Sequence, residues 1–298
     1  MKVASPLPIR ILTHNIRYAT SAPFRGEKSW ADRKQRLINE LQYHSRHNSE
    51  IFICLQEVLH IQLLDILSGL NSNSINGRDT GGSDWAYIGV GRDDGRQAGE
   101  YSPIFYRPAI WELEEFKTVW LSETPSVPSK GWDAASIRIV TVGIFKHRVS
   151  RKRVLGMSTH LDDQGCKSRL EAAKLILAQI DGYLSHGLLG SIDGVFLAGD
   201  FNSEEDQEAY TVLTAVNSPL IDAYKQVGAA LRYGSENTYT GFGYEDEPAK
   251  RIDYVLLGPQ NGNNHSWTIQ GYAVLPNKFD DGVLNSDHRA VVADAELA

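Results

Sequence analysis

The sequence predicts an α/β fold in which helices cover layered β-sheets. Strand-rich blocks fill the middle and the end of the chain, and three or four helical patterns interrupt them, an order typical of sheets with helices outside. The chain has 298 residues, of which 42% are hydrophobic, enough to bury a large core. No Pro-rich or Gly/Ser-rich linker and no internal repeat divides it, so we expect one domain over residues 1–298.

The first third of the chain alternates between strand and helix patterns. An apolar run at residues 9–12 predicts a short strand that ends in polar residues. Ser29, with Asp32 three residues later, has the spacing of a capping box. The apolar positions at residues 37–41 continue a helix that we expect to end near residues 45–48. The elements expected next are a buried strand at residues 51–55, a second helix at residues 61–67 and a loop at residues 71–84.

Short apolar runs dominate the rest of the chain and predict strands. They occupy residues 85–90, 104–106, 111–121, 137–145, 154–159, 195–197, 252–257, 267–275 and 290–293. A third helix is expected at residues 167–184, where apolar residues recur at helical spacing. A short helix is expected at residues 210–215.

Charge and cysteine content limit the function classes. The formal net charge is -7, so no global positive field holds a polyanion nonspecifically. The two cysteines provide neither a disulfide framework nor a zinc knuckle and indicate a reducing compartment. No stretch approaches the roughly 20 apolar residues of a membrane-spanning helix, and the N-terminus does not resemble a signal peptide. We therefore expect a soluble, cytoplasmic or otherwise intracellular protein without membrane insertion and without an obligate protein partner.

Several apolar strands end abruptly in groups that bind hard cations or move protons. These groups are Asn15, Gln56, Glu57, His160, Asp200, Asn202, Asp253, Asp287 and His288. Taken singly, each has an ordinary explanation, such as a turn, a half-buried histidine or a helix N-terminal charge. Polar ends of neighbouring strands can gather into one solvated cleft, and the conjunction of so many indicates a hydrolytic site.

Six short motifs are similar to the ordered signature motifs of the endonuclease/exonuclease/phosphatase superfamily. They span essentially the entire chain: LTHNIR at residues 12–17, LQEV at 55–58, STHL at 158–161, LAGDFN at 197–202, RIDY at 251–254 and NSDH at 285–288. Two further segments, residues 99–107 and 137–138, resemble positions of deoxyribonuclease I-like members that support the catalytic histidine and contact the phosphate. The resemblance implies a four-layer αββα sandwich, two mixed β-sheets flanked by helices.

The resemblance also implies a role for each site residue in a divalent-metal-dependent phosphoesterase. The implied metal ligands, for Mg²⁺ or Mn²⁺, are Asn15, Glu57 and Asp287. The implied catalytic residues are Asp200 and Asn202, which organise water and phosphate, and His160 and His288, which transfer protons and stabilise the phosphate. The implied supporting residues are Glu100 for His160, Asp253 for His288, and Arg138 at the phosphate.

These roles are chemically sound independently of the resemblance. Mg²⁺ and Mn²⁺ prefer oxygen ligands, which Glu57, Asp287 and the Asn15 carbonyl group supply. A phosphate ester repels its nucleophile, so a metal ion and cationic groups such as His288 and Arg138 neutralise charge in the transition state. A histidine backed by a carboxylate is a tuned acid–base group.

The substrate is less well indicated. The loop at residues 122–136 is long enough to form a wall beside the site, and its Trp132 either stacks on a substrate or anchors the loop. The net charge of -7 favours a compact phosphorylated molecule or a short phosphodiester. An endonuclease or exonuclease acting on DNA or RNA stays an alternative, because fold alone does not choose the substrate. Glycoside hydrolysis by paired carboxylates explains neither Asn202 nor the histidines, and every expected catalytic residue type is present, which argues against an inactive binding module.

Overall fold

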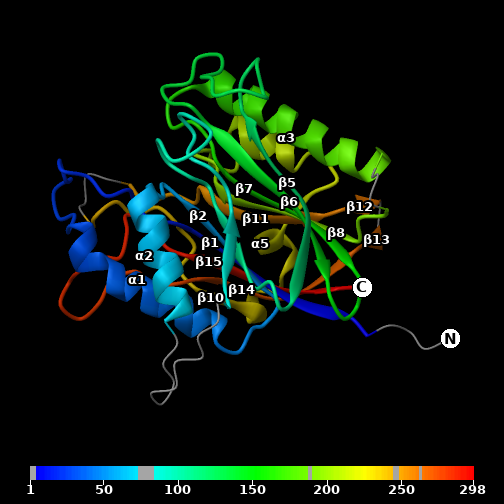
Figure 1. Cartoon of the computed structure of the whole chain (residues 1–298), viewed down its shortest axis with the longest axis horizontal. Coiled ribbons are helices and arrows are strands. Elements are labelled where there is room, and N and C mark those ends of the chain that lie inside the picture. The colour runs from blue at the N-terminus through cyan, green and yellow to red at the C-terminus, as the bar shows by residue number, and fades with distance from the viewer. Residues whose placement is uncertain (1–4, 73–83, 187–189, 244–247, 262–263) are drawn as a thin grey trace.

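Two β-sheets packed face to face form the centre of the computed structural model (Figure 1). The structure describes residues 5–72, 84–186, 190–243, 248–261 and 264–298. Among these, seven strands form the first sheet in the order β10-β14-β15-β1-β2-β4-β3. Their bounds are β1 (Leu7–Asn15), β2 (Ile51–Gln56), β3 (Ala86–Ile88), β4 (Ile104–Tyr106), β10 (Arg232–Gly234), β14 (Trp267–Val274) and β15 (Val291–Leu297).

Six described strands form the second sheet in the order β5-β6-β7-β8-β11-β9. Their bounds are β5 (Trp111–Trp120), β6 (Ile139–His147), β7 (Arg153–His160), β8 (Gly194–Asp200), β9 (Ile221–Asp222) and β11 (Asp253–Gly258). The short strands β12 (Gln260–Asn261) and β13 (Asn264–His265) pair separately. Both main sheets mix parallel and antiparallel pairs. In the first sheet β1 is parallel to β2 and antiparallel to β15, and in the second sheet β7 is parallel to β8 and antiparallel to β6.

Helices cover the outer face of each sheet. On the first sheet lie α1 (Trp30–Ser45) and α2 (His60–Asn71), and on the second lie α3 (Cys166–His186) and α4 (Glu208–Leu213). The remaining helices are α5 (Ala223–Gln226) and the 3-10 helix η1 (Ala229–Leu231). Ser29 caps α1 as expected, because its side chain accepts a hydrogen bond from the Asp32 N–H group. The predicted four-layer αββα sandwich is confirmed.

The central strands are apolar on both sides because each side faces a different layer. In β2, Phe52 and Cys54 point into the core between the sheets, whereas Ile53 packs toward α1 and α2. The ring of Phe52 lies 4.8 Å from that of Phe145 and 5.0 Å from that of Phe196 on the opposite sheet. Successive side chains of a strand alternate between its faces, so the continuous apolar run at residues 51–55 buries both.

Strand register brings the polar strand ends to one edge of the sandwich. The parallel pair β1 and β2 aligns Asn15 with Gln56, and the parallel pair β7 and β8 aligns His160 with Asp200. The antiparallel pair β8 and β11 places Asp253 opposite Asp200. Gly199 allows β7 and β8 to approach here, because a Cβ atom on it would lie 2.0 Å from the Thr159 carbonyl oxygen.

Several element boundaries differ from the sequence predictions. The strand expected at residues 85–90 is limited to β3, and the short helix begins and ends two residues earlier than expected. Most of the loop expected at residues 71–84 lies outside the described residues. The short elements β9, β10, β12, β13, α5 and η1 were not predicted.

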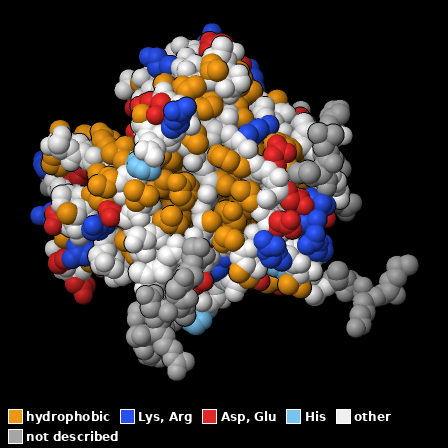
Figure 2. Space-filling view, in the orientation of Figure 1, with side chains coloured by type: hydrophobic (Ala, Val, Ile, Leu, Met, Phe, Trp, Pro, Cys, Tyr) orange, Lys and Arg blue, Asp and Glu red, His pale blue; other side chains and the backbone are white. Residues whose placement is uncertain are grey.

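None of the described helices is both long and apolar enough to cross a membrane. Figure 2 shows hydrophobic side chains at the centre of one face, with acidic and basic side chains interspersed around its margin. On this face the basic side chains form no continuous stripe, in agreement with the charge balance of the sequence.

Candidate active site

A cavity of about 570 Å³ opens where the polar strand ends meet. Its volume exceeds that of a phosphate group, so space is left for the rest of a substrate. Most of the predicted site residues line it. The lining residues are Arg17, Tyr18, Phe24, Glu57, Arg92, Glu100, Ser136, Arg138, His160, Asp163, Asp200, Asn202, Tyr239, Lys250, Ile252, Asp287 and His288.

Asn15 and Asp253 lie directly behind the cavity wall. Both are fully buried. The Asn15 side-chain amide donates hydrogen bonds of 3.0 Å to Glu57 Oε1 and to Asp200 Oδ2. Asp253 Oδ2 lies 2.8 Å from His288 Nδ1. The two residues therefore orient the groups that face the cavity.

The Asn15 carboxamide is held in one orientation by its hydrogen bonds. Its side-chain carbonyl oxygen accepts a 3.0 Å hydrogen bond from the Arg17 backbone N–H group, which turns the amide nitrogen toward Glu57 and Asp200. An amide nitrogen donates hydrogen bonds and does not ligate a hard cation. In this arrangement the Asn15 amide nitrogen orients the two carboxylates, and the role of Asn15 as a metal ligand stays a prediction.

Three residues at the cavity have strained backbones. Arg17, Glu57 and Asn202 have φ angles of 57°, 59° and 46°, in the left-handed region that side chains other than glycine rarely adopt. Such strain concentrates at functional sites, where the surrounding structure holds it in place. Each of these residues follows the end of a strand, and the strained backbone turns its side chain into the site.

His288 and His160 differ in protonation state. Burial lowers the pKa of His288, but the charges of Asp253 and Asp200 outweigh burial and raise the pKa to about 10. Burial together with Arg138 and Arg92 holds the pKa of His160 well below its usual range. At neutral pH His288 is therefore a cation and His160 is neutral.

Asp200 lies between the two histidines. Its Oδ2 atom is 3.5 Å from His160 Nε2 and 3.6 Å from His288 Nε2. Burial and the negative charge of Asp253 raise the pKa of Asp200 to about 7. A carboxylate with a pKa near neutrality accepts and releases protons efficiently.

Glu100 is near His160 without a hydrogen bond between them. The distance from Glu100 Oε2 to His160 Nδ1 is 3.8 Å, while the same oxygen accepts a 2.7 Å hydrogen bond from Arg92. His160 Nε2 instead lies 3.1 Å from the Asn202 amide nitrogen, which also donates to the Leu161 carbonyl oxygen. The structure thus places Asn202, rather than Glu100, in hydrogen-bonding contact with His160.

Arg138 and Trp132 differ in their relation to the cavity. Arg138 lines it and donates to Asp162 at 3.2 Å and to Asp163 at 2.7 Å. Trp132 is half-buried and is not among the lining residues, and its backbone N–H group donates to Glu123. This geometry does not support a contact between Trp132 and a bound substrate.

Sequence reasoning missed several lining residues, among them Arg17, Phe24, Arg92 and Lys250. Arg17 could have been found, because it lies two residues after Asn15 within the first motif. Phe24, Arg92 and Lys250 lie in loops whose local sequence carries no chemical pattern. Only the tertiary structure brings them to the cavity.

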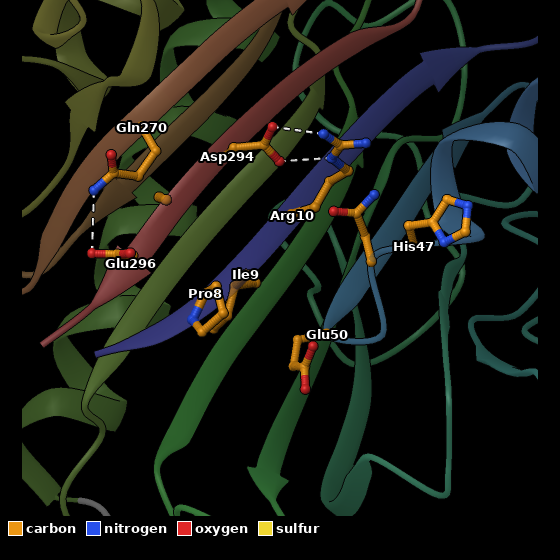
Figure 3. A pocket seen from close by; sticks show the side chains of 10 residues that line it. Pro8, Ile9, Arg10, His47, Glu50, Gln270, Asp294 and Glu296 are labelled. Atoms are coloured by element: carbon orange, nitrogen blue, oxygen red, sulfur yellow. Dashed lines mark hydrogen bonds and ion pairs between the residues drawn. The ribbon is translucent and has the colours of Figure 1, made fainter. Parts of the chain in front are cut away.

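Two features besides the predicted ligand set could bind an ion or a small molecule. Asp200, Asp253 and His288 bring ligand atoms within 4.8 Å of one another, an arrangement that could hold a metal ion. A second hollow of about 230 Å³ lies near β1 and β15 (Figure 3). There Arg10 and Asp294 neutralise each other at 2.6 Å, and the described residues that line it include none of the predicted site residues.

Comparison with known proteins extends the motif similarity. A model described as the Endonuclease/Exonuclease/phosphatase family matches residues 12–273. An endonuclease/exonuclease/phosphatase from Bacteroides vulgatus is 31% identical with a TM-score of 0.81, over 98% of this chain and 100% of that one. A mannosyl-6-phosphatase from Bacteroides thetaiotaomicron is 30% identical with a TM-score of 0.80, over 96% and 99%.

More distant structures share the fold. D. rerio TDP2, complexed with a single-strand DNA product, is 15% identical with a TM-score of 0.64, over 97% of this chain and 98% of that one. No match is found among curated proteins.

Proposed function

Because this chain belongs to the endonuclease/exonuclease/phosphatase family, we propose that it hydrolyses a phosphate ester of a compact molecule with the help of Mg²⁺ or Mn²⁺. The arrangement of His160, Asp200 and His288 carries the proposal. Asp200 lies within 3.6 Å of both histidines at the wall of one cavity. The three groups combine a proton acceptor with a fixed positive charge, which water attack on a phosphate requires.

Glu57 and Asp287 are the residues that would hold the cation. Burial and the charge of Glu57 raise the pKa of Asp287, so the two carboxylates repel each other, and a hard divalent cation fits such an oxygen donor pair. The cation supplies positive charge next to the phosphate. We assign it to this pair rather than to Asp200, Asp253 and His288, because the Asp253 carboxylate is already held 2.8 Å from His288 Nδ1.

The side chains of this protein have distinct parts in the reaction. Asp200, with its raised pKa, accepts the proton of the attacking water. Protonated His288 donates a hydrogen bond from Nε2 to the phosphate, while Asp253 holds its other ring nitrogen at 2.8 Å. His160, neutral and in contact with Asn202, positions the phosphate or the leaving oxygen.

The charge pattern of the cavity supports a compact substrate. Each described Arg or Lys that lines the cavity has a carboxylate within 4 Å, namely Arg17 with Glu57, Arg92 with Glu100, Arg138 with Asp163, and Lys250 with Glu204. A polynucleotide needs several cations that are free to contact successive phosphates. The likeness to a mannosyl-6-phosphatase at 30% identity also supports a small phosphorylated molecule, whereas the TDP2 structures support the fold alone.

The test is hydrolysis of a substrate panel by protein that a chelator has freed of metal ions, with and without added Mg²⁺ or Mn²⁺. The panel contains hexose phosphates, nucleotides, inositol phosphates, phospholipid headgroups, single-stranded RNA and duplex DNA. We expect activity on a small phosphate ester that requires the added cation. Full activity after exhaustive chelation would refute the metal assignment. If duplex DNA is the best substrate and its cleavage falls steeply with salt, the protein is a nuclease.

The assay needs a matched pair of histidine variants. His288→Ala removes the positively charged imidazolium group at the reacting centre and is expected to lower turnover at least about a hundredfold. His47→Ala removes an exposed histidine at the second hollow and is expected to retain wild-type turnover. Equal loss in both variants would show that the effect is not specific to the cavity.

A further inference from the structure

Phe24 is an exposed aromatic side chain at the wall of the charged cavity. It is 55% exposed, and it lines the same cavity as Glu57, Asp287 and His288. Single exposed hydrophobic side chains are common on protein surfaces and by themselves indicate no function. Phe24 differs from such side chains because its position is held by several specific contacts.

The guanidinium group of Arg17 stacks on the ring of Phe24. The guanidinium carbon lies 4.4 Å from the centre of the Phe24 ring and 4.3 Å from the centre of the Tyr18 ring. A guanidinium group stacks favourably on aromatic faces. Arg17 Nη1 also lies 3.6 Å from Glu57 Oε2. The ring is thereby placed at a defined position relative to a residue that we assign to the metal ion.

Glu27 fixes the backbone of the same loop. One oxygen of this buried carboxylate accepts a 2.8 Å hydrogen bond from the Phe24 N–H group, and the other accepts a 3.2 Å hydrogen bond from Arg17 Nε. The Glu27 N–H group donates to the Phe24 carbonyl oxygen at 3.0 Å. Because ring and backbone are both tied to Arg17 and Glu27, little conformational entropy is lost when a ligand contacts the ring.

We propose that Phe24 forms the leaving-group subsite and that it stacks against the sugar ring of a singly phosphorylated sugar. This inference rests on the proposed phosphoesterase function and names its substrate class. Bound phosphate occupies the end of the cavity near His160 and His288, and the leaving group extends from it into the remaining volume. The C–H face of a sugar ring packs on an aromatic face, which carries partial negative charge.

The polar lining of the cavity favours a sugar over a nucleobase. Glu100 and Asp163 line the same cavity, and their carboxylate oxygens can accept hydrogen bonds from hydroxyl groups. A sugar carries hydroxyl groups around its ring, whereas a nucleobase presents mainly amide-like and amino groups. The cations that could bind additional phosphates are already compensated by carboxylates, which favours a single phosphate.

The test compares wild type, Phe24→Ala and Phe24→Leu on hexose 6-phosphate, glycerol 3-phosphate and a nucleoside 5′-monophosphate. Loss of aromatic stacking corresponds to about a three- to tenfold change in affinity. We expect Phe24→Ala to raise the KM for hexose 6-phosphate by that factor relative to the KM for glycerol 3-phosphate, which has no ring. Phe24→Leu keeps an apolar contact without a ring face and should show an intermediate ratio. The control is Phe116→Ala, since Phe116 is 40% exposed on β5 and does not line the cavity.

Failure of this inference can be distinguished from failure of the proposed function. An unchanged KM ratio in a Phe24→Ala protein that still hydrolyses both phosphates refutes the subsite and leaves the function standing. A KM increase only for the nucleoside monophosphate refutes the sugar class. If wild type hydrolyses no phosphate ester, the proposed function is wrong, and calorimetric titration with hexose 6-phosphate still compares its binding to wild type and Phe24→Ala. Equal binding in that titration also refutes the subsite.

Discussion

Replacement of Asp253 by Asn is expected to remove the positive charge of His288 at neutral pH. Asp253 Oδ2 lies 2.8 Å from His288 Nδ1, and both side chains are buried. Burial lowers the pKa of His288, and the charges of Asp253 and Asp200 raise it to about 10. An Asn side chain still accepts the hydrogen bond from Nδ1, but it has no charge to offset burial.

The size of the effect follows from these contacts. Asp200 remains 3.6 Å from His288 Nε2 in the variant, so part of the stabilisation of the cation is kept. We expect the pKa of His288 to fall by about four units, or ~5 kcal/mol at 1.36 kcal/mol per unit, which takes it from about 10 to below neutrality. Loss of the positive charge of His288 at the phosphate should lower turnover at pH 7.5 at least about a hundredfold.

The assay has two parts, and each has a refuting result. NMR titration of labelled histidines in metal-free protein reports the pKa of His288 directly in wild type and Asp253→Asn. A pH profile of kcat/KM reports the effect on catalysis, with Asp294→Asn as control because Asp294 pairs with Arg10 outside the cavity. The reasoning is refuted if His288 of Asp253→Asn still titrates near pH 10, or if turnover is unchanged while the pKa falls.

The same pair predicts a pH dependence of stability. The folded-state pKa of His288, about 10, lies above the unfolded value of about 6.5. The stabilisation is therefore fully present below pH ~6.5 and is lost as pH rises through about 10. Urea unfolding of metal-free protein should show that the stability difference between wild type and Asp253→Asn shrinks across this window.

Three other substitutions test the assignments. Glu57→Gln should shift the Mn²⁺ binding titration to higher concentration, since an amide ligates more weakly than a carboxylate; an unchanged titration would show that Glu57 is not a ligand. His160→Ala should lose at least about a hundredfold in turnover while its circular dichroism stays native, and near-wild-type turnover would assign His160 to structure. Arg33→Met should lower the free energy of unfolding by about 3 kcal/mol or more, measured in urea. Fully buried Arg33 donates to the backbone carbonyl groups of Ile16 and Asn285, so a loss below about 1 kcal/mol would contradict this reasoning.

The main elements of the fold could be predicted because their apolar runs are long. The strand at residues 51–55 and the helix capped by Ser29 formed as expected. Strands of two or three residues, such as β9 and β10, were missed because such short pieces become strands only by pairing with β11 and β14. The single-domain organisation stays a prediction.

The grouping of the site could be predicted from the ends of the strands. Neighbouring parallel strands end at the same edge of a sheet, so the alignment of His160 with Asp200 follows once β7 and β8 are paired. Arg33 shows the limit of this reasoning. On α1 it resembles any solvated helix charge, yet the fold buries it completely against the loops that carry Arg17 and Asn285.

The sequence by itself determined which chemical groups are present and in which order along the chain. These sufficed for the family, the layered fold and about half of the residues around the cavity. Only the tertiary structure decided how those groups differ in charge and pairing. His160 and His288 are the same amino acid, each with a carboxylate expected nearby. Asp253 lies 2.8 Å from His288, whereas Glu100 lies 3.8 Å from His160 and is bound by Arg92. Burial and the charges within a few ångströms set a pKa. His288 and Asp253 are 35 residues apart in the chain, and local sequence patterns do not predict the distance between residues so far apart.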